Sequence, residues 1–214
     1  MKSIPRFQVI TDETLQTRYS HVELARLAVE GGADSIQFRE KRLKTTRELV
    51  NIAANMLEVC EKGDATLIVN DRVDVATAIN NMAVHLGQDD LLVDVARQVI
   101  GADAIIGGTA NSLEQAIEVE KTDVDYLGVG PVFGTTSKAK RAPDLGLESL
   151  AEICDQINKP VIAIGNIQPE NVADVIGSGA WGIAVLSGIV CQPNVTLATQ
   201  RYVEALESSV STKR

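Results

Sequence analysis

The sequence predicts an α/β protein folded as a single (βα)8 TIM barrel over residues 1–214. From Phe7 onward, short β-branched runs alternate with longer segments of helical period, which is typical of parallel strands joined by crossover helices. Eight such units in a chain of 214 residues favour a compact closed barrel. The alternative is a doubly wound open sheet. That fold would need a glycine fingerprint after its first strand to bind a nucleotide, and residues 11–15 (T-D-E-T-L) contain no glycine.

The expected strands are short and rich in residue types that are usually buried. They are Phe7–Thr11, Ser35–Arg39, Thr66–Val69, Ala83–Leu86, Ala104–Gly108, Tyr126–Val129, Val161–Ile164 and Gly182–Leu186. Helices are expected near 21–30, 45–61, 73–80, 91–100, 112–121, 147–157, 169–176 and 194–208. No linker or low-complexity run divides the chain, so we expect one domain.

Capping residues mark several helix starts. Ser20, Asp71 and Asn111 each precede an expected helix and can accept a hydrogen bond from one of its first N–H groups. Pro169 suits a first helical position. Residues 32–36 and 179–183 share the pattern Gly-Ala-x-x-Ile, in which glycine ends a helix before a buried strand. These signals support the repeated order of helix, corner and strand.

Composition and charge narrow the classes of function. The net charge is -9, so we expect no binding to nucleic acid or to an anionic membrane. No apolar run is long enough for a signal peptide or a membrane span. Cys60, Cys154 and Cys191 show no metal-binding or redox spacing, which indicates reduced thiols and a cytoplasmic location. A homo-oligomer is compatible with the sequence.

The stretch S-I-Q-F-R-E-K at 35–41 concentrates positive charge at the end of a strand. Side chains alternate between the two faces of a strand, so Gln37, Arg39 and Lys41 share one face. Two cations and an amide at a strand exit favour an anionic ligand. The alternative is a solvated strand end whose charges point into water.

Acidic residues follow the next two strands. In a barrel of this kind, the working residues stand at the carboxyl ends of the strands. Asp71 and Asp90 follow neighbouring strands and could approach each other across the mouth of the barrel. Two carboxylates beside an anion would repel it unless a hard cation lay between them, and Mg²⁺ fits that need. The alternative is that Asp71 caps a helix and that Asp90 begins another.

The long irregular stretch at 130–146 indicates a phosphate site. Its first part, G-P-V-F-G-T-T-S-K at 130–138, offers hydroxyl groups, backbone donors and a cation. Residues 165–167 (G-N-I) and 187–189 (S-G-I) follow the last two strands, where such barrels usually bind phosphate. Two anionic ligands, one beside the metal and one at the last two strands, would explain this layout.

The two histidines do not look catalytic. His85 lies within an apolar strand, which favours a hydrogen-bonded packing residue over a base or a metal ligand. His21 opens a helix, and we expect it to be solvated. Neither histidine has an obvious serine or cysteine partner, so a protein nucleophile is not expected.

Five motifs resemble those of the thiamine phosphate synthase family. They are Q-F-R-E-K (37–41), V-N-D (69–71), H-L-G-Q-D-D (85–90), G-P-V-F-G-T-T-S-K (130–138) and A-P-D-L-G-L-E-S-L (142–150). Their order and spacing extend the similarity over nearly the whole chain. The resemblance implies a (βα)8 barrel that joins hydroxymethylpyrimidine diphosphate to a thiazole phosphate with Mg²⁺, giving thiamine phosphate and diphosphate.

The resemblance also implies a role for each site residue. Asp71 and Asp90 would hold the metal ion, and Thr109 would lie against the pyrimidine ring. The pyrimidine diphosphate would be held by Gln37, Arg39, Lys41, Asn70 and Lys138. The thiazole phosphate would be surrounded by Thr135, Thr136, Ser137, Asn166, Leu186 and Ser187. Of these, Arg39, Lys41 and Lys138 are the expected catalytic cations, because loss of diphosphate builds negative charge while the pyrimidine becomes a carbocation.

Three positions depart from the family pattern. Asn166 stands where glycine is usual, Thr109 where serine is common and Asn111 where histidine is common. Asparagine tolerates a left-handed backbone, so a phosphate-binding turn can survive at position 166, although a side chain now enters the thiazole side.

Two other functions remain open at this point. A related branch tautomerises the thiazole phosphate, but that reaction would leave the diphosphate and metal groups without a role. It would also need a base, such as the histidine that is missing at position 111. A non-catalytic protein that binds a thiamine-related phosphate would suit the three departures.

Overall fold

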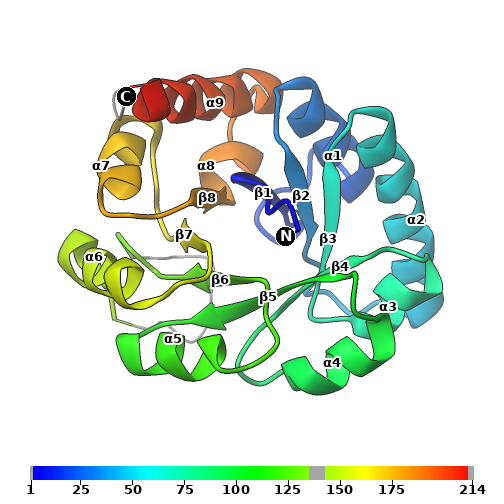
Figure 1. Ribbon diagram of the computed structural model, residues 1–214. Coiled ribbons are helices and arrows are strands. Elements are labelled where there is room, and N and C mark those ends of the chain that lie inside the picture. Colours follow the sequence, from blue (N-terminus) through cyan, green and yellow to red (C-terminus); the bar gives the residue numbers. More distant parts are fainter. Residues whose placement is uncertain (1, 135–142, 212–214) are drawn as a thin grey trace.

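Eight parallel strands close into a barrel in the computed structural model, which describes residues 2–134 and 143–211, without the side chains of 210 and 211. Each strand pairs with the next along the chain, and β8 pairs with β1. Figure 1 shows the helices as an outer ring around the strands. The prediction of a (βα)8 barrel is confirmed.

The strands and helices follow the predicted order. The strands are β1 (Phe7–Thr11), β2 (Ser35–Phe38), β3 (Thr66–Asn70), β4 (Ala83–Leu86), β5 (Ile105–Ala110), β6 (Tyr126–Val129), β7 (Val161–Ile164) and β8 (Gly182–Val185). The helices are α1 (His21–Glu30), α2 (Thr46–Lys62), α3 (Val73–Ala78), α4 (Val93–Ile100), α5 (Leu113–Glu120), α6 (Gly146–Gln156), the 3-10 turn η1 (Pro169–Asn171), α7 (Val172–Gly177), α8 (Ser187–Val190) and α9 (Val195–Ser211). The short helix α8 was not predicted. None of the helices in the described ranges is long and apolar enough to cross a membrane.

Two of the predicted helix caps are wrong. Ser20 caps α1 as predicted, in a reciprocal capping box with Glu23. Asp71 does not cap α3, which begins without a side-chain cap. Ser112, not Asn111, caps α5 by accepting a hydrogen bond from a backbone N–H of that helix. Asp71 and Asn111 are therefore available for other contacts at the mouth of the barrel.

The apolar core has two parts. The larger part lies between the barrel and the ring of helices. A smaller cluster contains Ile10, Tyr126, Ile162 and Ala184 from four strands, together with Ile4 from the N-terminal segment. Tight packing of the strands and helices leaves ligand chemistry to the loops at the ends of the barrel.

His85 is hydrogen-bonded inside the fold, as predicted. Its Nδ1 lies 3.1 Å from the Tyr126 hydroxyl, and its Nε2 lies 2.9 Å from Thr109 Oγ1. Gly107 and Gly128 make room for the two rings, since a Cβ atom at either position would collide with Tyr126 or His85 respectively. The sequence therefore places large rings opposite glycines.

Candidate functional site

Asp71 and Asp90 lie together at the carboxyl ends of β3 and β4. Asp71 has φ 64°, a left-handed conformation that aspartate adopts more readily than most residues, and its N–H donates to His85 O at 2.9 Å. Asp90 is half-buried, and its Oδ2 accepts a hydrogen bond from Gly87 N at 2.6 Å. The two carboxyl groups are within hydrogen-bonding reach of each other. The chain order predicts such an approach.

The aspartate pair carries more negative charge than its neighbours neutralise. Lys41 Nζ lies 2.5 Å from Asp71 Oδ2. Burial and the neighbouring Asp71 carboxyl raise the pKa of Asp90, even though the Gly87 N–H and Lys41 act in the opposite direction. A proton or a hard cation bound between the carboxylates would relieve their repulsion. Oxygen ligands of this kind suit Mg²⁺.

The exit of β2 sends its two cations to two different neighbours. The strand ends at Phe38, so regular alternation stops before the two cations. Arg39 forms an ion pair with Asp12 of the β1 exit, and Lys41 forms one with Asp71 of the β3 exit. The predicted convergence on one face is therefore replaced by a spread along the rim, with one cation beside β1 and the other beside β3.

A cavity of about 240 Å³ lies next to Lys41 between the loops that follow β2 and β3. Asn70 and Asp71 also line it. Three further cations line this cavity, namely Arg42, Lys44 and Arg72. Glu40 lines the cavity too, and each of the four cations is ion-paired with an acidic neighbour, so an anionic ligand would share these cations with the protein.

Gln37 and Thr109 hydrogen-bond to other side chains of the barrel. Gln37 is 4% exposed, and its Nε2 lies 3.5 Å from Gln8 Oε1. Thr109 holds His85 through its hydroxyl, while its backbone carbonyl accepts a hydrogen bond from Gln88. Gln88 precedes Asp90 on the same loop, so Thr109 links β5 to the loop that carries the second aspartate.

The exits of β7 and β8 carry the other predicted phosphate residues. Gly165 and Asn166 both have positive φ, 113° and 46°, so the predicted left-handed turn is present. The Asn166 side chain donates to Phe133 O at 3.4 Å. Leu186 and Ser187 are half-exposed, and Ser187 begins α8.

The predicted loop residues lie outside the described part of the chain. These are Thr135, Thr136, Ser137 and Lys138. The segment that leads to them is fixed to the β7 exit, because Val132 N donates to Ile164 O at 2.9 Å and Phe133 N donates to Gly165 O at 3.1 Å. The loop therefore starts beside Asn166.

Sequence reasoning missed the residues behind the β2 exit. The prediction that His21 is solvated is wrong, because its side chain is fully buried, with Nε2 3.3 Å from Glu40 Oε2. Glu40 itself has a side chain only 2% exposed. Strand alternation could not reveal this contact, because β2 ends at Phe38, before position 40.

Comparisons with known proteins point to one family. The sequence model of the family described as "Thiamine monophosphate synthase" matches residues 7–189. A thiamine-phosphate synthase of Salinibacter ruber is 44% identical over 206 residues, covering 96% of this chain and 90% of the relative. One of Methanospirillum hungatei is 40% identical over 198 residues, covering 92% and 96%.

The chain belongs to the thiamine monophosphate synthase family.

The solved structures include another relative of the family. A thiamine phosphate pyrophosphorylase from Pyrococcus furiosus superposes with a TM-score of 0.87 at 38% sequence identity, and the match covers 96% of each chain. The barrel described above is therefore shared with a relative over almost its full length.

The structure shows the contacts of the three residues that depart from the family pattern. Thr109 keeps a hydroxyl, which is bound to His85. The Asn111 side chain donates to the carbonyl of Gly130, at the start of the long loop. Asn166 keeps the left-handed backbone that glycine would have adopted. Two of the three departures, Asn111 and Asn166, therefore contact the segment that leads into the loop.

Proposed function

We propose that this chain joins 4-amino-5-hydroxymethyl-2-methylpyrimidine diphosphate to a thiazole phosphate, giving thiamine phosphate and diphosphate. Membership of the family and the names of the relatives support this transferase reaction. The structural observation that carries the proposal is the group formed by Asp71, Asp90 and Lys41 at the mouth of the barrel.

Mg²⁺ is the metal that we infer for this site. The donors fit it, because Asp90 and Asp71 interact closely, and burial together with the Asp71 carboxyl raises the pKa of Asp90. Asp71 and Asp90 would hold the ion, with water and phosphate oxygens as the remaining ligands. When bound, Mg²⁺ would neutralise charge on the diphosphate leaving group.

The cations at the mouth of the barrel would also neutralise charge on the diphosphate leaving group. Departure of diphosphate leaves negative charge on its oxygens, and fixed positive groups lower the barrier when they are aimed at that charge. We assign this role to Arg39, Lys41 and Lys138. Arg39 has further guanidinium donors besides the one that binds Asp12, because a guanidinium has five N–H groups.

The remaining residues orient the two substrates. Gln37 and Asn70 would help to hold the pyrimidine diphosphate, and Thr109 would lie against the pyrimidine ring. Asn166, Leu186 and Ser187, together with the loop residues Thr135, Thr136 and Ser137, would surround the thiazole phosphate. The thiazole nitrogen then captures the pyrimidine carbocation directly, so no protein nucleophile is needed.

The substrates are the partners that we propose, in a cytoplasmic setting. The free thiols at Cys60, Cys154 and Cys191 support a reducing compartment. The net charge of -9 argues against nucleic acid as a partner. A homo-oligomer is compatible with this reaction, although the proposed residues all come from one barrel.

One assay tests the reaction and separates it from the other functions. Purified protein is incubated with both substrates and Mg²⁺, and thiamine phosphate is measured. We expect product with Mg²⁺ and none after chelation by EDTA. Conversion of the thiazole phosphate into a tautomer without coupling would identify an isomerase, and binding of both ligands without turnover would identify a non-catalytic protein. Either result would overturn the proposal.

A further inference from the structure

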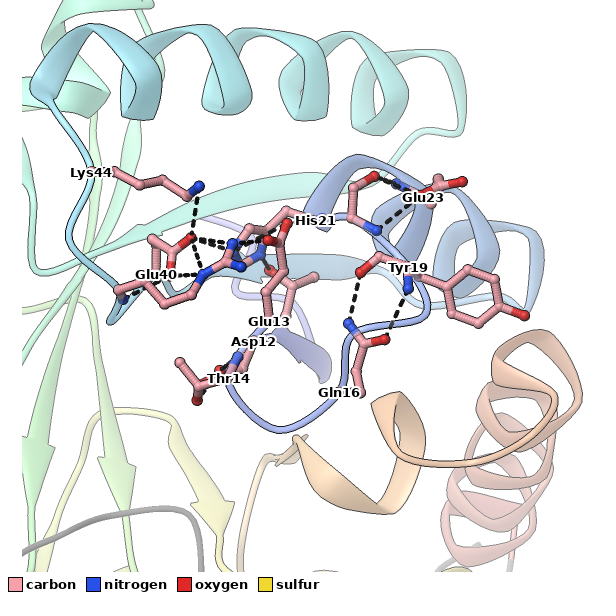
Figure 2. Close-up of polar contacts among 12 residues, drawn as sticks. Asp12, Glu13, Thr14, Gln16, Tyr19, His21, Glu23, Glu40 and Lys44 are labelled. Carbon is pink, nitrogen blue, oxygen red and sulfur yellow. Dashed lines mark hydrogen bonds and ion pairs between the residues drawn. The ribbon is translucent and has the colours of Figure 1, made fainter.

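Glu40 is a buried carboxylate that stands between Arg39 and Lys41 in the sequence. Its side chain is 2% exposed and accepts several donors at once. Arg42 contributes its backbone N–H at 2.8 Å and its guanidinium at 2.9 Å. Lys44 Nζ lies 3.6 Å away, and His21 Nε2 lies 3.3 Å away. Figure 2 shows Glu40 and Lys44 of the loop after β2 directed toward His21 at the start of α1.

His21 supplies a rigid donor to this carboxylate. Its ring is fully buried and packs edge-on against Phe38, with ring centroids 4.8 Å apart. A carboxylate only accepts hydrogen bonds, so Nε2 carries the proton that faces Glu40. Nδ1 lies 2.8 Å from the Thr11 hydroxyl, which also lies 3.3 Å from Gln37 O. Burial lowers the pKa of His21 despite the attraction of Glu40, so the imidazole is a neutral bridge from β1 to the β2 exit.

Glu13, His21 and Glu40 together have the composition of a metal site, with ligand atoms within 4.8 Å of one another. Two cations already occupy their surroundings, however. Arg42 pairs with both glutamates, and Lys44 adds a second positive charge beside Glu40. Two carboxylates are thus matched by two protein cations, which makes the cluster an internal anchor and not a metal centre.

The anchor lies beside a segment that has no regular secondary structure. Residues 39–45 follow the last ladder position of β2 and precede α2, and they form neither strand nor helix. Leu43, within this segment, is fully exposed. Arg39 and Lys41 reach opposite neighbours along the rim, while Glu40 points behind them into the cluster. Fixing Glu40 therefore fixes the directions in which its two neighbours leave the backbone.

We propose that Glu40 is a positioning residue of the diphosphate site, which holds the β2 exit so that Arg39 and Lys41 face the leaving group. This inference rests on the proposed function for the identity of the ligand. Glu40 acts through its neighbours and does not touch the diphosphate itself. His21, Arg42 and Lys44 are the groups that hold it.

The test compares two variants of Glu40 with a matched control. Glu40→Ala removes the anchor, whereas Glu40→Gln keeps its volume and one acceptor oxygen but loses the charge. Asp125→Asn is the control, because Asp125 is also a carboxylate that binds an arginine, a lysine and a backbone N–H, but at the opposite end of the barrel. The probe is inorganic diphosphate with Mg²⁺, titrated by calorimetry, with the KM of each substrate and the Tm as further readouts.

We expect the loss to be specific to the diphosphate side. A misplaced catalytic group can cost about 100-fold in rate, and we expect a loss of kcat/KM of this size in Glu40→Ala. Glu40→Gln should weaken diphosphate binding by about tenfold, since hydrogen bonds to a neutral amide are weaker than those to a carboxylate. The KM for the thiazole phosphate should not change in either variant. Asp125→Asn should lower the Tm and leave diphosphate affinity unchanged.

The outcomes separate this inference from the proposed reaction. If the wild-type protein turns over and Glu40→Gln keeps wild-type diphosphate affinity, the positioning role is wrong and the reaction stands. If the wild type binds diphosphate but makes no thiamine phosphate, while Glu40→Gln binds weakly, the reaction is wrong and the positioning role stands. An equal rise in KM for both substrates would mean that Glu40 only stabilises the fold, which would overturn the positioning role. Glu40→Gln decides the matter if Glu40→Ala does not fold.

Discussion

Asp125 and Asp90 stand at opposite ends of the barrel, and their surroundings differ in one respect. Asp125 precedes β6 at the amino end and pairs with Arg97 and Lys2. Burial would raise the pKa of Asp125, but Arg97 and a backbone N–H hold it below the ordinary value. At the carboxyl end, burial and a second carboxyl raise the pKa of Asp90. One end neutralises its charge internally, and the other leaves charge for a ligand.

The backbone shows the same contrast. Asp64 and Asn80 have φ of 55° and 54° just after α2 and α3, where a left-handed residue is an ordinary way to end a helix. Asp71 and Asn166 have φ of 64° and 46° just after β3 and near the end of β7. No helix end requires these, so the unusual conformations of the mouth belong to residues that we assign to ligands.

The largest expected effect is loss of coupling when the aspartate pair is broken. Asp71→Ala or Asp90→Ala should lower Mg²⁺-dependent formation of thiamine phosphate by at least about 100-fold, because the leaving group loses its metal ion. The far-ultraviolet circular dichroism should stay that of the wild type. Unchanged activity in either variant would remove these residues from the metal site.

The second effect concerns Lys138 and separates the two ligands. Lys138→Ala should reduce kcat by about 100-fold, since a cation aimed at the departing diphosphate is lost. The KM for the thiazole phosphate should change far less. Steady-state kinetics with each substrate varied in turn measures both. The reverse ranking would mean that the two ligands have been assigned to the wrong sides of the mouth.

The amino end should respond to mutation in stability and not in catalysis. Asp125→Asn should cost about 2 kcal/mol at neutral pH, because Arg97 and Lys2 lose their partner. In a chain of this size, that corresponds to a fall in Tm of about 4–8 °C. The pKa of Asp125 is lowered in the folded state, so the stabilisation by its ion pairs is present above the unfolded-state pKa. It disappears as the pH falls through the folded-state pKa. Melting curves against pH should converge in acid, and kcat should match the wild type.

A small effect is expected at the thiazole side. Asn166→Gly should leave activity the same or slightly higher, because glycine adopts the observed left-handed backbone and removes a side chain from the pocket. The KM for the thiazole phosphate is the quantity to follow. A large loss would show that the Asn166 amide, which now donates to Phe133 O, has a role in binding.

The smallest effect is a gain in stability at the mouth. The pKa of Asp90 in the folded state is raised, so its contribution to stability is full below the unfolded pKa and is lost as the pH rises through the folded-state pKa. At neutral pH, ionised Asp90 therefore destabilises the fold. Asp90→Asn should therefore raise the Tm by about 1–2 °C without metal. Differential scanning calorimetry at pH 7 is sufficient. A fall in Tm would mean that Lys41 already neutralises the pair.

The parts of the fold that follow from buried strands were predictable. Residues 161–164 are continuous β-branched and apolar residues, and a strand at that place needs no knowledge of its neighbours. The placement of Asp71 and Asp90 on one rim follows from chain direction alone, since parallel strands all end on the same side.

The parts that depend on packing between distant segments were not predictable. Asp71 was predicted to cap a helix, because the local sequence cannot reveal its positive φ. His21 looked solvated because it opens a helix, yet contacts with Thr11, Phe38 and Glu40 bury it. Each of these errors concerns a residue whose environment is supplied by another strand.

Calorimetric titration of Mg²⁺ into the protein with inorganic diphosphate tests the central claim most directly. The wild type should bind both together, while Asp71→Ala and Asp90→Ala should bind neither at the same concentrations and Asp125→Asn should bind as the wild type does. Equal binding by all four proteins would contradict the claim that the charge left uncompensated at the mouth is the ligand site.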